Sequence, residues 1–122
     1  MRFMMIIIPK VYQPETPLEE RAGEGFVPPE EDVAKMSKYN EELSKAGVLI
    51  SLDGLQPLSK GARVAFSQGN LRITDGPDIE AKEVVGGYWL IDVKSKEEAV
   101  DWAKKVPAGD GDVIEVRQIF EM

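Results

Sequence analysis

The 122-residue sequence contains no cysteine and no histidine. Without cysteine the chain has no thiol nucleophile, no disulfide and no thiolate ligand for a metal. Without histidine it lacks the side chain that ordinarily titrates near neutral pH, and the commonest zinc ligand. Any acid–base chemistry must therefore use carboxylates, lysine or tyrosine with shifted pKa values. We expect no metal and no other cofactor.

Positive charge and long apolar runs are also scarce. The formal net charge is −7, which is a poor electrostatic match to a phosphate backbone, so we expect no direct nucleic-acid binding. The apolar run Phe3–Ile8 is too short for a signal-peptide core or a membrane span, and we expect a cytoplasmic protein without membrane contact. The length and the 43% hydrophobic share indicate one globular domain over residues 1–122.

Two segments carry apolar residues on both faces of a predicted strand. In Phe3–Ile8 the alternation places Phe3, Met5 and Ile7 on one side, and Met4, Ile6 and Ile8 on the other. Tyr88–Val93 has a similar character. Strands that are apolar on both faces are typical of the centre of a sheet that is covered on both sides.

The remaining elements follow from spacing and from start and stop signals. A helix is predicted from Glu30 to Gly47, with an apolar stripe at intervals of three and four residues, and a second opens with a capping box at Ser95–Glu98. Further strands are predicted at Val48–Leu52 and Val113–Phe120, the latter with Ile114, Val116 and Phe120 facing one way. Two short alternating runs, Arg63–Phe66 and Leu71–Thr74, flank a hairpin turn at Ser67–Asn70.

This order predicts an α+β fold: a ferredoxin-like split βαβ unit with an antiparallel sheet, two helices on one face and an inserted hairpin. The helices cover one apolar face of the central strands. A second copy of the chain is the simplest cover for the other, so we expect a homodimer. The stretch Pro9–Pro29 has no periodicity, and we leave open whether it is a binding loop or a surface excursion.

One series of segments covers nearly the whole chain in a fixed order: Phe3–Ile6, Met36, Lys38–Leu43, Lys45–Leu49, Gly54–Leu55, Ser59–Val64, Thr74–Pro77, Glu80–Glu83, Gly87–Trp89, Lys94–Ala99 and Glu115–Arg117. In these segments and their order the chain resembles the DGPF-type proteins of the YCII-related family. The resemblance implies a dimeric α+β barrel. A His–Asp pair proposed as the site in relatives cannot be carried over, because this chain has no histidine, and Asp78 stands where the family motif has an aromatic residue.

The densest polar cluster surrounds the Gly76–Pro77 turn. Pro77 fixes its own φ and biases Gly76 toward extended geometry, which would hold the Asp75 carboxylate in one direction as a general acid or base. Lys82 is a candidate for stabilising an oxyanion. The alternative is that Asp75 caps the turn through the backbone within a solvated loop. The predicted ligand-binding residues are Tyr39, Arg72, Gly76, Pro77, Glu80 and Lys82, with a core role for Tyr39 as its alternative.

Two functions remain open. The chain is expected to bind or transform a small cyclic or phenolic molecule in a cleft at the dimer, by lyase-type or other carboxylate chemistry. The alternative is a non-catalytic regulatory or interaction module linked to transcription through protein contacts, since genes of the resembled family often lie near those of extracytoplasmic-function sigma factors.

Overall fold

The computed structural model describes residues 1–23, 25–76 and 83–121. Its strands are β1 (Arg2–Ile8), β2 (Leu49–Gly54), β3 (Ala62–Ser67), β4 (Asn70–Asp75), β5 (Gly87–Asp92) and β6 (Val113–Gln118). Its α-helices are α1 (Glu30–Lys45) and α2 (Lys96–Lys104), and short 3₁₀ turns lie at Lys10–Tyr12, Leu18–Glu20 and Leu58–Lys60. Neither α-helix in this described part has the length and apolar character needed to cross a membrane.

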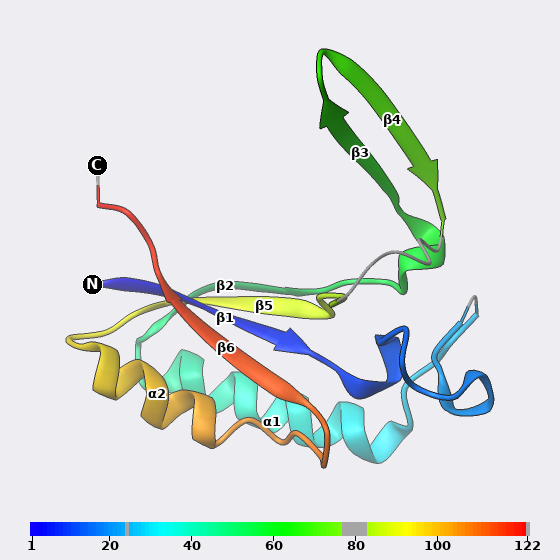
Figure 1. Ribbon diagram of the computed structural model, residues 1–122. Coiled ribbons are helices and arrows are strands. Elements are labelled where there is room, and N and C mark those ends of the chain that lie inside the picture. The colour runs from blue at the N-terminus through cyan, green and yellow to red at the C-terminus, as the bar shows by residue number, and fades with distance from the viewer. Residues whose placement is uncertain (24, 77–82, 122) are drawn as a thin grey trace.

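Four strands form one antiparallel sheet in the order β2-β5-β1-β6. Both helices cover one face of it, and the β3–β4 hairpin forms a separate two-stranded sheet that rises from the other side (Figure 1). The predicted α+β split βαβ architecture is therefore confirmed. The prediction that β1 and β5 are the central strands is also confirmed.

The core lies between the sheet and the helices. Phe3, Met5, Leu43 and Ile91 are its largest fully buried side chains, and burying each contributes about 2 kcal/mol through the hydrophobic effect. The Tyr39 ring packs edge-on against two tryptophan rings, with centroid distances of 5.8 Å to Trp89 and 6.4 Å to Trp102. This cluster fixes α1 and α2 against β5.

Local signals place most element ends correctly. Ser95 Oγ accepts from the Glu98 N–H at 3.1 Å, as the capping box predicts, and the Glu98 carboxylate accepts from the Lys94 N–H at 2.9 Å. The hairpin turn has its positive φ values at Gln68 (48°) and Gly69 (81°), a two-residue turn whose twist suits the strands.

Two details differ from the expectation. β6 ends at Gln118, so Phe120 does not continue the inward face of Ile114 and Val116 but is 88% exposed. Of the apolar stripe predicted on α1 (Val33, Met36, Tyr39, Leu43 and Ala46), only Tyr39 and Leu43 are buried. Val33 and Ala46, near the two ends of the helix, are exposed, and Met36 is half-buried. Amphipathic spacing fixed the face of the helix but not how far the sheet extends beneath it.

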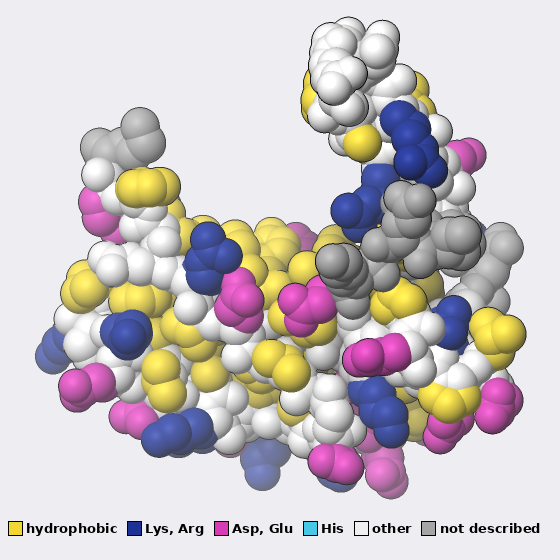
Figure 2. Space-filling view, viewed as in Figure 1, with side chains coloured by type: hydrophobic (Ala, Val, Ile, Leu, Met, Phe, Trp, Pro, Cys, Tyr) yellow, Lys and Arg dark blue, Asp and Glu magenta, His cyan; other side chains and the backbone are white. Residues whose placement is uncertain are grey.

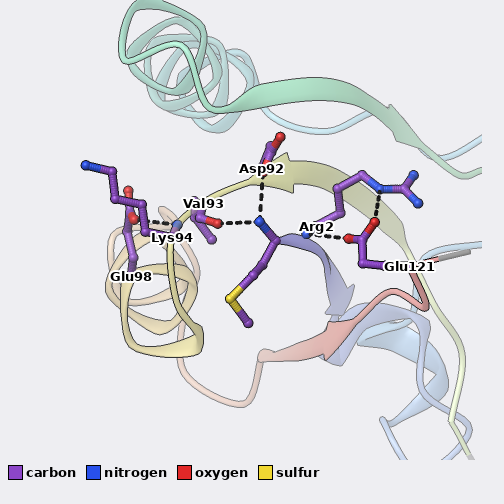
Figure 3. A network of polar contacts seen from close by, with 7 residues as sticks. Arg2, Asp92, Val93, Lys94, Glu98 and Glu121 are labelled. Atoms are coloured by element: carbon purple, nitrogen blue, oxygen red, sulfur yellow. Dashed lines mark hydrogen bonds and ion pairs between the residues drawn. The ribbon is translucent and has the colours of Figure 1, made fainter.

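One end of the sheet is tied by polar contacts (Figure 3). The Met1 amino group donates to Asp92 Oδ1 at 3.1 Å and to the Val93 carbonyl at 2.8 Å. The Arg2 N–H donates to Glu121 at 3.2 Å, which holds the segment after β6 beside β1. The contacts to Asp92 and Glu121 are exposed, so they position chain segments more than they stabilise the fold, whereas the contact to the Val93 carbonyl is partly buried.

The face of the sheet opposite the helices is also apolar. Met4 and Ile6 alternate with the buried Phe3 and Met5, and Leu90 pairs with Met4 across the ladder. Figure 2 shows hydrophobic side chains over the sheet between the C-terminal segment and the hairpin. We call Met4, Ile6 and Leu90 the open sheet face.

Candidate functional site

A cavity of about 440 Å³ lies at the end of the sheet where β1 leaves it. It is bounded by α1, the chain after β1, the ends of β2 and β5, and the segment before β6. Its size falls in the range of small-molecule sites, about 300–1,000 Å³. Its lining is Ile7, Pro9, Val11, Tyr12, Phe26, Pro28, Asp32, Met36, Asn40, Leu52, Asp53, Gly54, Gly86, Gly87, Tyr88, Trp89, Pro107, Gly109 and Asp112.

Helix α1 supplies one wall. Asp32, Met36 and Asn40 follow at intervals of four residues, which places them along one stripe of the helix. Asn40 Oδ1 accepts from Trp89 Nε1 at 2.7 Å, which fixes the indole ring at the inner end of this stripe. The helix therefore presents a carboxylate, a thioether and an amide in sequence along the cavity.

Aromatic rings supply much of the rest. Tyr12 and Phe26 pack edge to face with centroids 6.4 Å apart, and Trp89 of β5 belongs to the same lining. The Tyr12 hydroxyl donates to the Leu55 carbonyl at 2.8 Å, and burial raises the pKa of this hydroxyl, so it stays protonated. The combination of apolar rings and a few polar groups is typical of sites for flat organic molecules.

The chain after β1 is held in place by side chains that bond to backbone. Gln13 donates to the carbonyls of Pro9 at 2.6 Å and Val84 at 2.9 Å, and accepts from the Val84 N–H at 2.9 Å. Arg21 donates to the Thr16 carbonyl, and the Ala22 N–H donates to the Val11 carbonyl at 2.7 Å. These contacts fix the wall that carries Tyr12, so the cavity is largely preformed.

Glycines let the backbones approach at the sheet end of the cavity. A Cβ on Gly86 would lie 2.6 Å from Pro9 Cγ, and one on Gly87 would lie 2.8 Å from the Asp53 carbonyl oxygen. Both contacts are shorter than real side chains allow. The Gly86–Gly87 pair thus brings the chain after β1 against β5 and closes this side of the cavity.

The carboxylates differ in what they bind. Asp112 accepts from the Lys10 N–H at 2.8 Å and from the Gly109 N–H at 2.9 Å, one at each oxygen. Asp53 accepts from the Tyr88 hydroxyl at 3.3 Å. Among the described residues, no group of three or more acidic side chains is placed to hold a metal ion.

The structure places the predicted site residues elsewhere. Asp75 ends β4, opposite Ala62 in the hairpin ladder, and is exposed. Arg72 lies opposite Ala65 on the same hairpin and is exposed. A second cavity of about 420 Å³ adjoins this region, lined by residues between Leu55 and Arg63 and by Glu83–Val85, and Asp75 is not among its described lining residues.

The geometry expected at Gly76 is wrong. Gly76 has a φ of +73°, in the left-handed region, and its N–H donates to the Gly61 carbonyl at 2.8 Å. That hydrogen bond closes the base of the hairpin. Because glycine has no Cβ, it adopts the left-handed conformation that this bond requires at little steric cost. The bias that a following proline imposes is overridden here by the hairpin closure.

Tyr39 belongs to the core, which favours the alternative stated for it. Its ring is buried, its hydroxyl donates to the Trp102 carbonyl at 2.7 Å, and it is not in the cavity lining. Burial, with a contribution from Glu42, raises the pKa of this hydroxyl well above its usual range. The remaining predicted residues, Pro77, Glu80 and Lys82, lie with Asp78 outside the described residues.

Sequence reasoning missed the residues that build the cavity. Tyr12 and Phe26 lie on the chain after β1, Asp32 and Asn40 lie on α1, and none of them belongs to a motif. One signal was present, since the aperiodic, proline-rich stretch Pro9–Pro29 is longer than most connections in a compact domain. Two interpretations were left open for this stretch, a binding loop and a surface excursion, and the cavity favours the binding loop.

The split βαβ core with its inserted hairpin and this cavity define the protein as a ferredoxin-like α+β protein. The chain belongs to the YCII-related domain family, whose family model matches residues 1–122. It is 35% identical over 69 residues to an uncharacterised protein of Rhizobium meliloti (strain 1021), and the match covers 57% of this chain and 56% of that protein. The chain thus spans about half the length of this relative, whose name gives no activity.

Proposed function

We propose that this protein binds a small organic molecule with a cyclic or aromatic body in the cavity between α1, the Pro9–Pro29 loop and the sheet. The observation that carries the proposal is the cavity itself, about 440 Å³ in volume and walled by Tyr12, Phe26 and Trp89. Side-chain-to-backbone hydrogen bonds hold the loop wall of the cavity in place. Ligand binding therefore costs little conformational entropy of the loop.

The two tryptophans allow a direct test. The Trp89 indole lines the cavity, whereas Trp102 lies outside the lining and serves as the internal reference. We expect small aromatic fragments of positive, neutral and negative charge, screened at millimolar concentration, to include ligands that shift the Trp89 indole N–H signal in ¹H–¹⁵N NMR spectra. The Trp102 signal is expected to stay in place.

A blocking variant completes the test. Met36→Trp adds a ring to the cavity wall and is expected to abolish the shift, while Val33→Trp, one turn earlier on α1 at an exposed position outside the lining, should leave it unchanged. A screen without any Trp89 response, or a response that Met36→Trp leaves intact, would contradict the proposed function.

We also propose that the protein works as a homodimer. Two apolar surfaces support this proposal, because a second copy would bury them. They are the open sheet face and the apolar side of the hairpin, formed by Val64, Phe66, Leu71 and Ile73. Leu90→Asp is expected to give a sedimentation mass of one 13.5 kDa chain, where the unaltered protein gives twice that mass. Val33→Asp, on an exposed part of α1, is the matched control, and a single-chain mass for the unaltered protein at micromolar concentration would overturn the dimer.

Within such a dimer, Asp75 stays the proposed acid–base group of a cleft beside the hairpin base, with Arg72, Gly76, Pro77, Glu80 and Lys82 as ligand contacts. Asp75→Asn is expected to abolish turnover of a compound whose binding shifts the backbone N–H signals of the hairpin base, without changing the melting temperature. Unchanged turnover would remove Asp75 from the mechanism.

The second candidate function is a regulatory module that acts through protein contacts. The observation that favours it is the exposure of the hairpin's apolar side, where Phe66 is 80% exposed. If the protein has this regulatory function, Phe66→Asp should leave the homodimer intact and should weaken binding to a sigma factor in a purified mixture. If Phe66→Asp instead abolishes the homodimer, the apolar side of the hairpin binds a second copy of the chain and not a regulatory partner.

A further inference from the structure

The charged residues that line the cavity all have the same sign. Asp32, Asp53 and Asp112 belong to the lining, and among the described residues it includes no lysine or arginine. Asp32 and Asp53 are exposed, so solvent and salt screen them in part, but three carboxylates with no basic residue in the described lining leave a negative potential in the cavity. Such a potential favours a positively charged ligand over an anionic one.

The Asp32 carboxylate is the one most available to a ligand. Both oxygens of Asp112 already accept backbone N–H groups, and Asp53 accepts from Tyr88. The Asp32 side chain is exposed, and among the residues that the structure describes its carboxylate has no hydrogen-bond or ion-pair partner, while the Asp32 backbone N–H donates to the Pro29 carbonyl at 3.1 Å. It lies in the first turn of α1, so the helix holds it in a fixed position beside the cavity.

The other walls suit the rest of an organic cation. Tyr12, Phe26 and Trp89 present aromatic rings, whose faces attract cations. Met36 lies between Asp32 and Asn40 along the helix stripe and offers an apolar contact to a ligand body. Aromatic rings combined with carboxylates recognise an organic ammonium group, whereas a bare metal ion requires several carboxylate ligands gathered around one point.

We propose that the cavity selects a small organic cation: a protonated amine joined by a short linker to a flat ring. The ring packs against Trp89 and Met36, and the ammonium group pairs with Asp32. This inference rests on the ligand-binding function proposed above and specifies the class of ligand.

Three phenolic compounds of nearly equal size test the charge preference. Tyramine carries a protonated amine, tyrosol has a neutral hydroxyl in its place, and 4-hydroxyphenylacetate has a carboxylate. In titrations that follow the Trp89 indole signal, tyramine should bind about tenfold more tightly than tyrosol, because it adds a charge pair and a cation–π contact. 4-Hydroxyphenylacetate should bind most weakly.

A pair of charge-matched variants assigns the preference to Asp32. Asp32→Asn should weaken tyramine binding about fivefold and leave tyrosol binding unchanged, because only the charge pair is lost. Asp101→Asn removes the same charge from the exposed surface of α2, where Asp101 Oδ1 lies 3.7 Å from Lys104 Nζ. This control should change neither the tyramine affinity nor the tyrosol affinity. Equal weakening of tyramine and tyrosol by Asp32→Asn would contradict the charge pair.

The outcomes separate this inference from the function on which it rests. Ligands found in the fragment screen that are neutral or anionic, or a tyrosol affinity equal to that of tyramine, would overturn the cation preference and leave the binding function standing. The absence of any Trp89 response to fragments of every charge would overturn both.

Discussion

The Pro9–Pro29 loop and the β3–β4 hairpin both leave the four-stranded sheet, and they are ordered in opposite ways. The loop has little regular backbone structure, yet it buries Gln13 (7% exposed) and Thr16 (3% exposed). The hairpin has a continuous antiparallel ladder, yet its side chains Phe66 and Ile73 are 80% and 69% exposed. Regular hydrogen bonding and tight packing are therefore separate properties in this molecule.

The difference shows what each region needs in order to be stable. In the loop, side chains replace the missing ladder, since Gln13 pairs with both backbone groups of Val84 as a neighbouring strand would. In the hairpin, the ladder satisfies the backbone, but the apolar side chains stay in water. The packing of the loop is complete within one chain, whereas the apolar side of the hairpin is left for the proposed homodimer to cover.

The largest effect is expected from removing the contacts of Gln13. Gln13→Ala takes away three hydrogen bonds and leaves the buried Val84 groups unpaired, so the free energy of unfolding should fall by about 2–4 kcal/mol. Urea denaturation measures this loss, and hydrogen exchange at the Val84 N–H reports it locally. Gln56→Ala, at an exposed position, is the matched control and should change stability by less than about 0.5 kcal/mol.

An equal loss in the two glutamine variants would contradict this view of the loop. It would mean that the contacts between Gln13 and Val84 contribute no more than an exposed side chain does. The hydrogen-exchange measurement separates local from global loss, because a loop that opens alone speeds exchange at Val84 without changing the slowest-exchanging amides of β1.

The hairpin was predictable because its signals are local. Alternation in Arg63–Phe66 and Leu71–Thr74 and the intervening turn lie within a dozen residues of each other, and the capping box at Ser95 is local in the same sense. The central positions of β1 and β5 were predictable for a related reason, because apolar residues on both faces of a strand report burial directly.

The cavity was not predictable, because its contacts join distant parts of the chain. Gln13 and Val84 are 71 positions apart, and Asn40 and Trp89 are 49 apart. No spacing rule connects them, and glutamine in a proline-rich stretch is ordinarily exposed. The local density of charge drew attention to Asp75 instead, which the structure places on the exposed hairpin.

A smaller effect is expected in the core between the sheet and the helices, where one variant measures the contribution of a single hydrogen bond. Tyr39→Phe removes the bond to the Trp102 carbonyl and should cost about 1 kcal/mol at neutral pH. Because burial raises the pKa of Tyr39 in the folded protein, its contribution is full below the unfolded-state pKa of about 10 and declines as the pH rises above it.

The stability difference between the unaltered protein and Tyr39→Phe should therefore narrow in alkaline solution. Urea denaturation at a series of pH values measures it. Tyr88→Phe, which removes an exposed bond to Asp53, is the control and should cost less at neutral pH. A difference for Tyr39→Phe that stays constant through the alkaline range would show that burial does not hold the proton on this hydroxyl.

The smallest effect on the single chain is expected at the hairpin's apolar side. Phe66→Ala should change the free energy of unfolding by less than about 0.5 kcal/mol in dilute solution, because the ring contacts little in one chain. If a second copy covers this surface, the cost must grow as the protein concentration rises, since association then stabilises the unaltered hairpin but not the variant.

Melting temperatures measured over a range of concentrations test this, with Ser67→Ala on the other side of the hairpin as the control. A cost for Phe66→Ala that is the same at every concentration would mean that the hairpin is as complete within one chain as the loop is.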